Sequence, residues 1–222
     1  MRKFLMSAVM GTGLAVSAAT GAGAEVITNW LNITNNGNSN VASQLSVEVT
    51  AVGTDKVLFK FMNNVGIASS ITDIYFDDGT TPVLATPMGL AGSTGVSFSQ
   101  NASPPNLPGA NGAVPPFNTT IGLSADSNPP VSKNGINAAS EWLELTLNLV
   151  GGKSFADVIA DLNSGDLRIG MHIQSIGTTG GSDSYVNGRP SFGPPIPAPA
   201  AIAVFGVALA GLGLALRRRQ DA

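Results

Sequence analysis

Apolar and polar residues alternate with a period of two along the central part of this chain. In Leu45–Ala51 and Leu143–Leu149, every second side chain is Leu, Val or Ala, and polar residues stand between them. Because successive side chains of a strand point to opposite faces, this pattern is typical of a strand with one buried face. We expect strands at Leu45–Ala51, Val57–Met62, Ile71–Phe76, Gly95–Ser99, Leu143–Leu149 and Leu167–Ile176.

Six or more strands separated by Gly, Asn and Pro turns predict a mostly β fold of one domain, either a β-sandwich or a jelly roll. One segment has helical spacing instead. Apolar residues recur there at Phe155, Val158, Ile159 and Leu162, and Ser154 precedes them at the position of a helix cap. We therefore expect one short helix packed on the edge of the sandwich.

A proline-rich stretch interrupts the strands between Ser103 and Pro130. It holds seven of the fourteen prolines of the chain, and proline has no amide hydrogen to donate to a sheet. The stretch is also too long for an ordinary turn, so we expect a long surface loop over 103–130. A second irregular stretch, Gly177–Ser184, is rich in glycine and predicts a flexible turn.

The first residues have the pattern of an export signal. Arg2 and Lys3 give a positive start, and the apolar stretch Phe4–Ala19 follows. Ala22 and Ala24 have the small side chains that signal peptidase accepts around its cut. We expect a signal peptide at 1–24, with the Sec machinery and signal peptidase as partners, and an exported domain at 25–193.

The last residues combine a proline-flanked segment, an apolar stretch and a basic end. Residues 200–216 hold seventeen positions without a charge, which as a helix span about 25 Å, slightly less than the ~30 Å core of a bilayer. Arginine side chains at the cytoplasmic end of a helix resist translocation. We expect a transmembrane helix at 200–216 and a cytoplasmic basic tail at 217–219, formed by Arg217, Arg218 and Arg219.

The order of these parts resembles the PEP-CTERM sorting signal of Gram-negative bacteria, with residues 194–222 as the signal and Pro197, Ala198 and Pro199 at the place of its Pro-Glu-Pro motif. Segments 70–79, 95–100 and 167–174 are similar to stretches of PEP-CTERM proteins of unassigned function. The resemblance implies an exosortase, a membrane cysteine protease, as processing partner, and export alongside extracellular polysaccharide. Ala198 stands where the motif has glutamate, which implies an exosortase-like enzyme of different specificity.

Composition and charge narrow the range of possible partners further. Charged residues make up 11% of the chain, against about 25% in typical globular proteins. Residues 25–199 hold six basic and thirteen acidic residues, a net charge of −7, which makes nucleic acid an unsuitable partner. The sequence has no cysteine, so an exported form depends on a packed core, or on a cation, rather than on disulfides.

Three carboxylates form the one candidate metal site. Asp73, Asp77 and Asp78 lie in a short window that ends at Gly79, and calcium binds clustered oxygen ligands. Their spacing differs from that of an EF-hand loop. The alternative interpretation is a turn, because Asp and Gly are ordinary turn residues. Calcium is therefore the one candidate cofactor, and otherwise we expect none.

The sequence offers weak candidates for catalysis. Glu141 and Glu144 resemble a glycosidase pair only in composition, because on a strand they point to opposite faces. His172 is the only histidine, so a Ser-His-Asp hydrolase would depend on it, and its position predicts a residue on the polar face of a strand. Trp30 and Trp142 are either core residues or platforms for sugar rings.

These patterns predict a non-enzymatic surface or extracellular-matrix protein. It would insert transiently in the inner membrane, undergo exosortase-like processing, and then reside on the cell surface, in an exopolysaccharide matrix or in the medium. Two alternatives stay open. The first alternative is a secreted carbohydrate-binding module or carbohydrate-active enzyme with the same sorting signal. The second is a permanently anchored inner-membrane protein.

Overall fold

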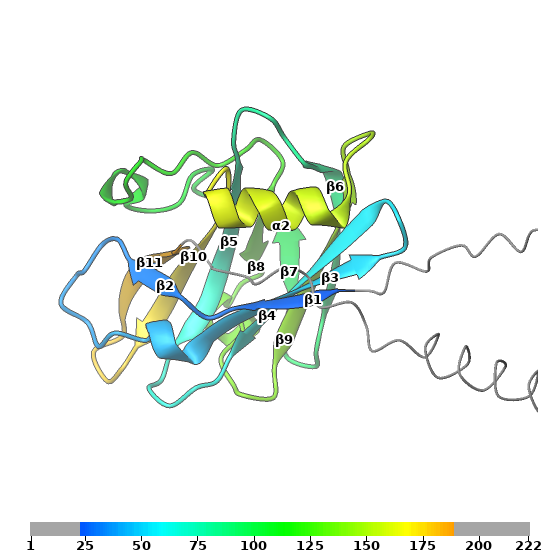
Figure 1. Cartoon of the computed structure of the whole chain (residues 1–222). Coiled ribbons are helices and arrows are strands. Elements are labelled where there is room, and N and C mark those ends of the chain that lie inside the picture. Colours follow the sequence, from blue (N-terminus) through cyan, green and yellow to red (C-terminus); the bar gives the residue numbers. More distant parts are fainter. Residues whose placement is uncertain (1–22, 189–222) are drawn as a thin grey trace, which may run out of the picture. The chain divides into compact units, whose positions relative to one another are not determined.

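The structure is a computed structural model that describes residues 23–188. Two antiparallel sheets pack face to face as a β-sandwich (Figure 1). The five-stranded sheet has the order β1-β3-β4-β9-β6, and the six-stranded sheet has the order β2-β11-β10-β5-β8-β7. The strands are β1 (Ala24–Ile27), β2 (Trp30–Asn32), β3 (Leu45–Val52), β4 (Lys56–Asn63), β5 (Ser70–Asp78), β6 (Leu84–Gly92), β7 (Phe98–Gln100), β8 (Ser124–Ser127), β9 (Trp142–Leu149), β10 (Leu167–Ile176) and β11 (Gly181–Asn187).

The prediction of a β-sandwich is thus confirmed at the level of the architecture, not of its finer topology. The alternating apolar residues of its strands form the core. Strands β3, β4 and β9 bury every second side chain, as the period of two predicts. Aromatic rings join the two sheets: the centroids of Phe59 on β4 and Phe76 on β5 lie 5.0 Å apart in an edge-to-face contact. The core therefore lies between the sheets, and their outer faces are left for polar chemistry.

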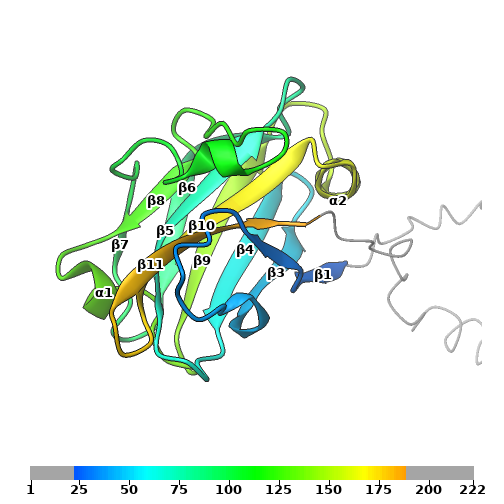
Figure 2. The ribbon, with the colours of Figure 1, turned by 90° about the vertical axis from the view of Figure 1, so that its left-hand side faces the viewer.

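The predicted short helix is α2 (Phe155–Ser164), which runs crosswise to β5 and β10 (Figure 1). Ser154 caps it as expected, because its side chain accepts the amide hydrogen of Asp157 and the Asp157 carboxylate accepts that of Ser154. Val158, Ile159 and Leu162 are buried in the main core. In Figure 2, α2 is seen nearly end-on beside the sheets, which agrees with the predicted edge position.

The expectation of one long loop over 103–130 is wrong in part. Residues 124–127 form β8, which pairs with β5 and β7 in the six-stranded sheet. Two more short elements lie in or directly after the proline-rich stretch: the 3₁₀ turn η2 (Ala110–Gly112) lies in it, and the single-turn helix α1 (Val131–Asn134) follows it. Four residues of β8 are too few to show a period, so tertiary pairing decides this strand. A third single turn, η1 (Ala42–Gln44), precedes β3.

Two other expectations need correction. The Gly-rich stretch 177–184 is a turn only as far as Gly180, and its remainder begins β11, which pairs with β10. The strand expected at Gly95–Ser99 begins later, at Phe98, because Gly95 lies in a turn with a φ of 96°. Strand β6 was not predicted, since Pro87 and two glycines lie within it and its pairing with β9 has an irregularity between Ala85 and Gly89.

Candidate functional site

A row of titratable side chains crosses the outer face of the six-stranded sheet. His172 on β10 lies opposite Asp73 on β5, and Asp73 lies opposite Asp126 on β8. Directly opposed residues of adjacent strands have Cβ atoms about 5 Å apart, so the three side chains are in reach of one another. His172 Nδ1 lies 2.9 Å from Asp73 Oδ2, and the Thr72 hydroxyl donates to the same oxygen at 2.8 Å.

Burial and charge shift the pKa of one carboxyl group in this row. Burial raises the pKa of Asp126 to about 6, and the negative charge of Asp73 and a hydrogen bond between the two carboxyl groups act in the same direction. The backbone N–H of Ser103, which donates to Asp126 at 3.4 Å, and the nearby His172 oppose the rise. The Asp126 carboxyl therefore keeps its proton to a higher pH than an exposed aspartate does, and it lies too close to Asp73 for a sugar to fit between the two carboxyl groups.

Asp126→Asn is expected to stabilise the protein at about pH 8 and to change little at about pH 4. The folded pKa of about 6 lies above the unfolded value of about 3.9. The stabilising contribution of this group is thus complete below the unfolded pKa, and it is lost as the pH rises through 6. Asparagine carries no charge and keeps an oxygen for the Ser103 N–H.

Urea unfolding of both proteins at the two pH values measures this difference. Asp55→Asn, which also removes one carboxylate but at an exposed aspartate in the β3–β4 turn, is the matched control and is expected to change the free energy of unfolding at about pH 8 by less than Asp126→Asn does. A constant difference between Asp126→Asn and the original protein across the pH range would contradict the assignment.

The segment 101–123 covers the rest of this outer face. Its Leu107, Ala110, Ala113 and Phe117 form a second apolar cluster with Tyr75 and Val186 on the sheet. Gly170 on β10 makes room for it, because a Cβ there would lie 2.8 Å from Leu107 and 3.1 Å from Phe117. The covering segment is thus packed against the sheet by its own small core.

An ion pair holds the covering segment at the other end of the face. Arg168 Nη2 donates to Asp77 Oδ2 and to the carbonyl of Pro116, and Arg168 Nη1 donates to the carbonyl of Pro115 at 2.6 Å. Both ionic side chains are 12% exposed. The Arg168 guanidinium also lies 5.3 Å from the centre of the Phe117 ring. Arg168 therefore connects β5, β10 and the covering segment.

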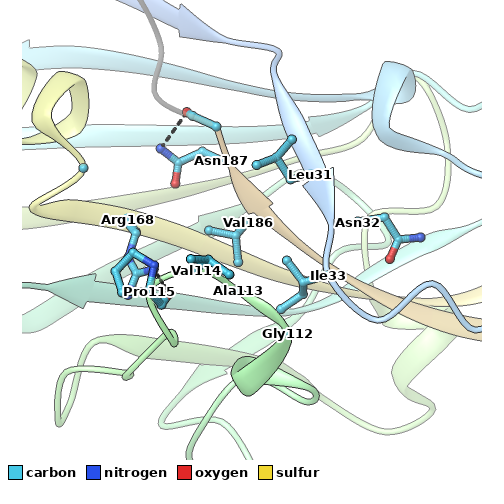
Figure 3. Close-up of a pocket in the computed structure, with 12 residues that line it drawn as sticks. Leu31, Asn32, Ile33, Gly112, Ala113, Val114, Pro115, Arg168, Val186 and Asn187 are labelled. Carbon is cyan, nitrogen blue, oxygen red and sulfur yellow. Dashed lines mark hydrogen bonds between the residues drawn. The ribbon is translucent and has the colours of Figure 1, made fainter.

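A groove of 340 Å³ opens beside this arginine, between the edge strand β2 and the covering segment (Figure 3). Leu31 and Val114, which are 54% and 97% exposed, lie on its two sides. Its polar groups are used internally: Asn187 accepts the Ile169 N–H at 2.6 Å, and Arg168 is bound as described. The groove offers apolar contacts and no reactive group among the residues that Figure 3 labels.

The three aspartates of the predicted calcium site are not brought together. Asp73 and Asp77 share the outer face of β5, but four residues of a strand span about 13 Å, whereas calcium ligands lie within about 2.6 Å of the ion. Asp78 points to the other face and accepts the N–H groups of Val83 and Leu84. Among residues 23–188, no group of three His, Cys, Asp or Glu side chains is placed to hold a metal ion.

The candidate catalytic residues are tied into the fold. Glu141 lies before β9 rather than on it, and its Oε2 accepts the N–H groups of Asn137 and Ala138. Glu144 forms an ion pair with Lys60 at 3.3 Å. His172 lies on the polar face as expected, but it contacts Asp73 and only 14% of its side chain is exposed. Of the two tryptophans, Trp30 is buried in the core, whereas Trp142 is half-buried beneath Lys60.

The predicted processing residues lie mostly outside the described part of the chain. Ala22, Pro197, Ala198, Pro199 and the arginines 217–219 lie outside residues 23–188, as does the helix expected at 200–216. Ala24 is described, and it begins β1 opposite Thr50. No helix within residues 23–188 is long and apolar enough to cross a membrane.

The role of Asp126 was missed because it falls in the proline-rich stretch, where no period marks a strand. Only the pairing of β8 with β5 places it beside Asp73. Comparison with known proteins adds no further assignment: no family model, no curated protein and no solved structure matches the chain significantly.

Proposed function

We propose that this protein is a non-enzymatic exported protein of the cell surface or extracellular matrix, delivered by an N-terminal signal and a C-terminal sorting signal that an exosortase-like enzyme removes. One observation carries the proposal. All eleven described strands and both apolar clusters lie between Ala24 and Asn187. Removal of residues 1–24 and 194–222 therefore takes away only Ala24, the first residue of β1, and no core residue of the described sandwich.

The state of the polar groups supports a structural role. The side chains that acid–base chemistry would use are engaged in contacts that hold the fold, as Arg168 with Asp77 and His172 with Asp73 show. Among the described residues that line the groove beside Arg168, none is an acid, base or nucleophile with a free reactive atom. Such an arrangement favours a stable module over a catalyst.

The surface supports residence in a hydrated polymer. Only 11% of the residues are charged, and the exposed polar groups are supplied by Asn, Ser, Thr and Gly residues, as in the loop 32–40 around Asp183. Neutral polar groups bind water and hydroxyl groups without the salt dependence of charged surfaces. This chemistry is compatible with association with exopolysaccharide.

The mass of the intact protein recovered from its native host tests the proposal. We expect a species that begins at Glu25 and lacks everything after about Pro197, found on the surface, in the matrix or in the medium. In a strain without its exosortase, the same protein is expected to keep Arg217–Arg219. Recovery of the complete C-terminus from the inner membrane of the unmodified strain would show a permanent anchor instead.

A further inference from the structure

Asparagine followed by glycine is the dipeptide most prone to lose its side-chain amide in water. Glycine has no Cβ, so its backbone nitrogen can reach the side-chain carbonyl carbon of the asparagine before it. The reaction requires a glycine N–H that is free to react and room for a ring to close. The chain holds four such pairs, at Asn36–Gly37, Asn111–Gly112, Asn134–Gly135 and Asn187–Gly188.

Three of the pairs are protected by the fold. The N–H groups of Gly112, Gly135 and Gly188 each donate to a backbone carbonyl, at 2.8 Å, 2.9 Å and 2.8 Å. Such a bond holds the hydrogen that the nitrogen must lose before it attacks, and it fixes the peptide plane. The same glycines are closely packed, because a Cβ on any of them would lie within 2.4 Å of a neighbouring atom. These pairs therefore react only after local opening of the structure.

The fourth pair has neither restraint. Gly37 lies in the loop 32–40, which follows β2 (Figure 1), and its N–H makes no hydrogen bond to any of residues 23–188. A Cβ on Gly37 would find no atom within 4 Å, so there is room for a ring to close. Asn36 is exposed, and water can therefore reach its side-chain amide.

Asn36 also lies at the contact that holds the loop 32–40 to the sheet. Its N–H donates to Asp183 Oδ1 at 2.8 Å, and its Nδ2 donates to the carbonyl oxygen of Ser182 at 2.9 Å. Asp183 is 1% exposed and accepts two more hydrogen bonds from the loop, from the Thr34 hydroxyl at 2.7 Å and from Asn38 Nδ2 at 3.0 Å. The Asp183 carboxylate is thus the anchor of the loop.

We propose that Asn36 deamidates spontaneously and that the new negative charge releases the loop 32–40 from Asp183. The Gly37 nitrogen loses its proton to water and attacks Asn36 Cγ. A C–N bond forms, and Nδ2 takes up a proton and leaves as ammonia. Water then opens the five-membered succinimide ring at either of its two carbonyl carbons, which gives aspartate or isoaspartate at position 36. Water is the only other reactant.

The product reverses the contacts of Asn36. A carboxylate has no hydrogen to donate, so it would place an oxygen against the carbonyl oxygen of Ser182. It also brings a second negative charge beside the buried Asp183 carboxylate. Isoaspartate in addition lengthens the backbone by one methylene group, which displaces the N–H that donates to Asp183. A bound loop thereby becomes a repelled one.

The inference goes beyond the proposed function, because the reaction depends only on water and on the loop 32–40. A correctly sorted protein could keep the Asn36 amide, and a permanently anchored one could lose it. The test of deamidation and the test of sorting therefore fail independently.

The first test incubates the protein purified from its host for weeks at neutral pH. Trypsin places the four pairs in separate peptides, because Lys56, Lys133 and Lys153 lie between them. Mass spectrometry follows the gain of one mass unit, and fragment spectra locate it. Asn36 is expected to react at least about fivefold faster than each other pair, the factor that one broken backbone hydrogen bond contributes to a rate. Equal rates at all four pairs, or a faster reaction at another pair, would overturn the proposal.

The same incubation in urea separates the effect of the fold from that of the local sequence. The four pairs are expected to react at similar rates there, because unfolding removes the hydrogen bonds and the packing that protect three of them. If Asn36 leads by the same factor in urea as in the folded protein, the structural basis of the proposal is wrong.

A charge variant tests the release of the loop. Asn36→Asp reproduces one product of the reaction, and Asn35→Asp adds the same charge at an exposed neighbour, which makes it the matched control. After correction for intrinsic rates, hydrogen exchange at the backbone amide of residue 36 is expected to be about tenfold faster in Asn36→Asp than in Asn35→Asp, the effect of one lost hydrogen bond to a charged group. Equal exchange in the two variants would overturn the release of the loop.

Discussion

Replacement of Arg168 by methionine is expected to lower the free energy of unfolding by about 3 kcal/mol. The substitution leaves the Asp77 carboxylate, 12% exposed, without its cation, and removes the donors to the carbonyl oxygens of Pro115 and Pro116. Methionine keeps much of the apolar length that covers Phe117. Urea unfolding followed by tryptophan fluorescence measures the loss.

The same substitution is expected to loosen the covering segment 101–123. This segment contains no Lys or Arg, and its Phe117 is buried in the second apolar cluster with the Arg168 guanidinium over its ring. Chymotrypsin, which cuts after phenylalanine, is therefore expected to cleave after Phe117 faster in Arg168→Met. The double variant Asp77→Asn with Arg168→Met removes the stranded charge and should recover part of the stability. If Arg168→Met changes neither the free energy of unfolding nor the rate of cleavage, the ion pair does not stabilise the covering segment.

Replacement of Phe76 by alanine is expected to cost about 3–5 kcal/mol of the free energy of unfolding. Phe76 is fully buried on β5, and its ring makes edge-to-face contacts with Phe59 and Phe61 of the opposite sheet. The substitution leaves a cavity between the sheets and removes both contacts. Equilibrium unfolding in urea at neutral pH measures the difference.

Two variants set the scale for this loss. Phe76→Leu keeps most of the buried volume and is expected to cost far less than the alanine variant. Phe98→Ala, at a half-buried ring on the edge strand β7, is also expected to lower the free energy of unfolding by much less than Phe76→Ala does. A loss in Phe76→Ala no larger than that in Phe98→Ala would mean that the interface between the sheets is not the main source of stability.

The sequence prediction succeeded where an element has a clear period of its own. The long alternating strands β3, β4, β9 and β10 were predicted nearly to their ends, because each buries one face and exposes the other. The helix α2 was predicted from its cap and spacing. Short strands such as β8 and β11 were missed, because they are held by their neighbours in the sheet and have no period of their own.

The candidate sites show the same limit. The window of three aspartates was visible in the sequence. On the extended strand β5, however, Asp73 and Asp77 lie far apart, and Asp78 points to the other face. The partner that matters for Asp73 is Asp126, fifty-three positions further along the chain.

The sequence by itself determined that the chain is a β-rich domain with its apolar positions on one face of each strand, between two ends that resemble export and sorting signals. Local periodicity and charge carry that information, because they depend on neighbours in the chain. Only the tertiary structure decided which carboxylates lie side by side and which arginine holds the covering segment. Those properties depend on strand pairing between distant residues, and pairing is selected by the packing of the whole core.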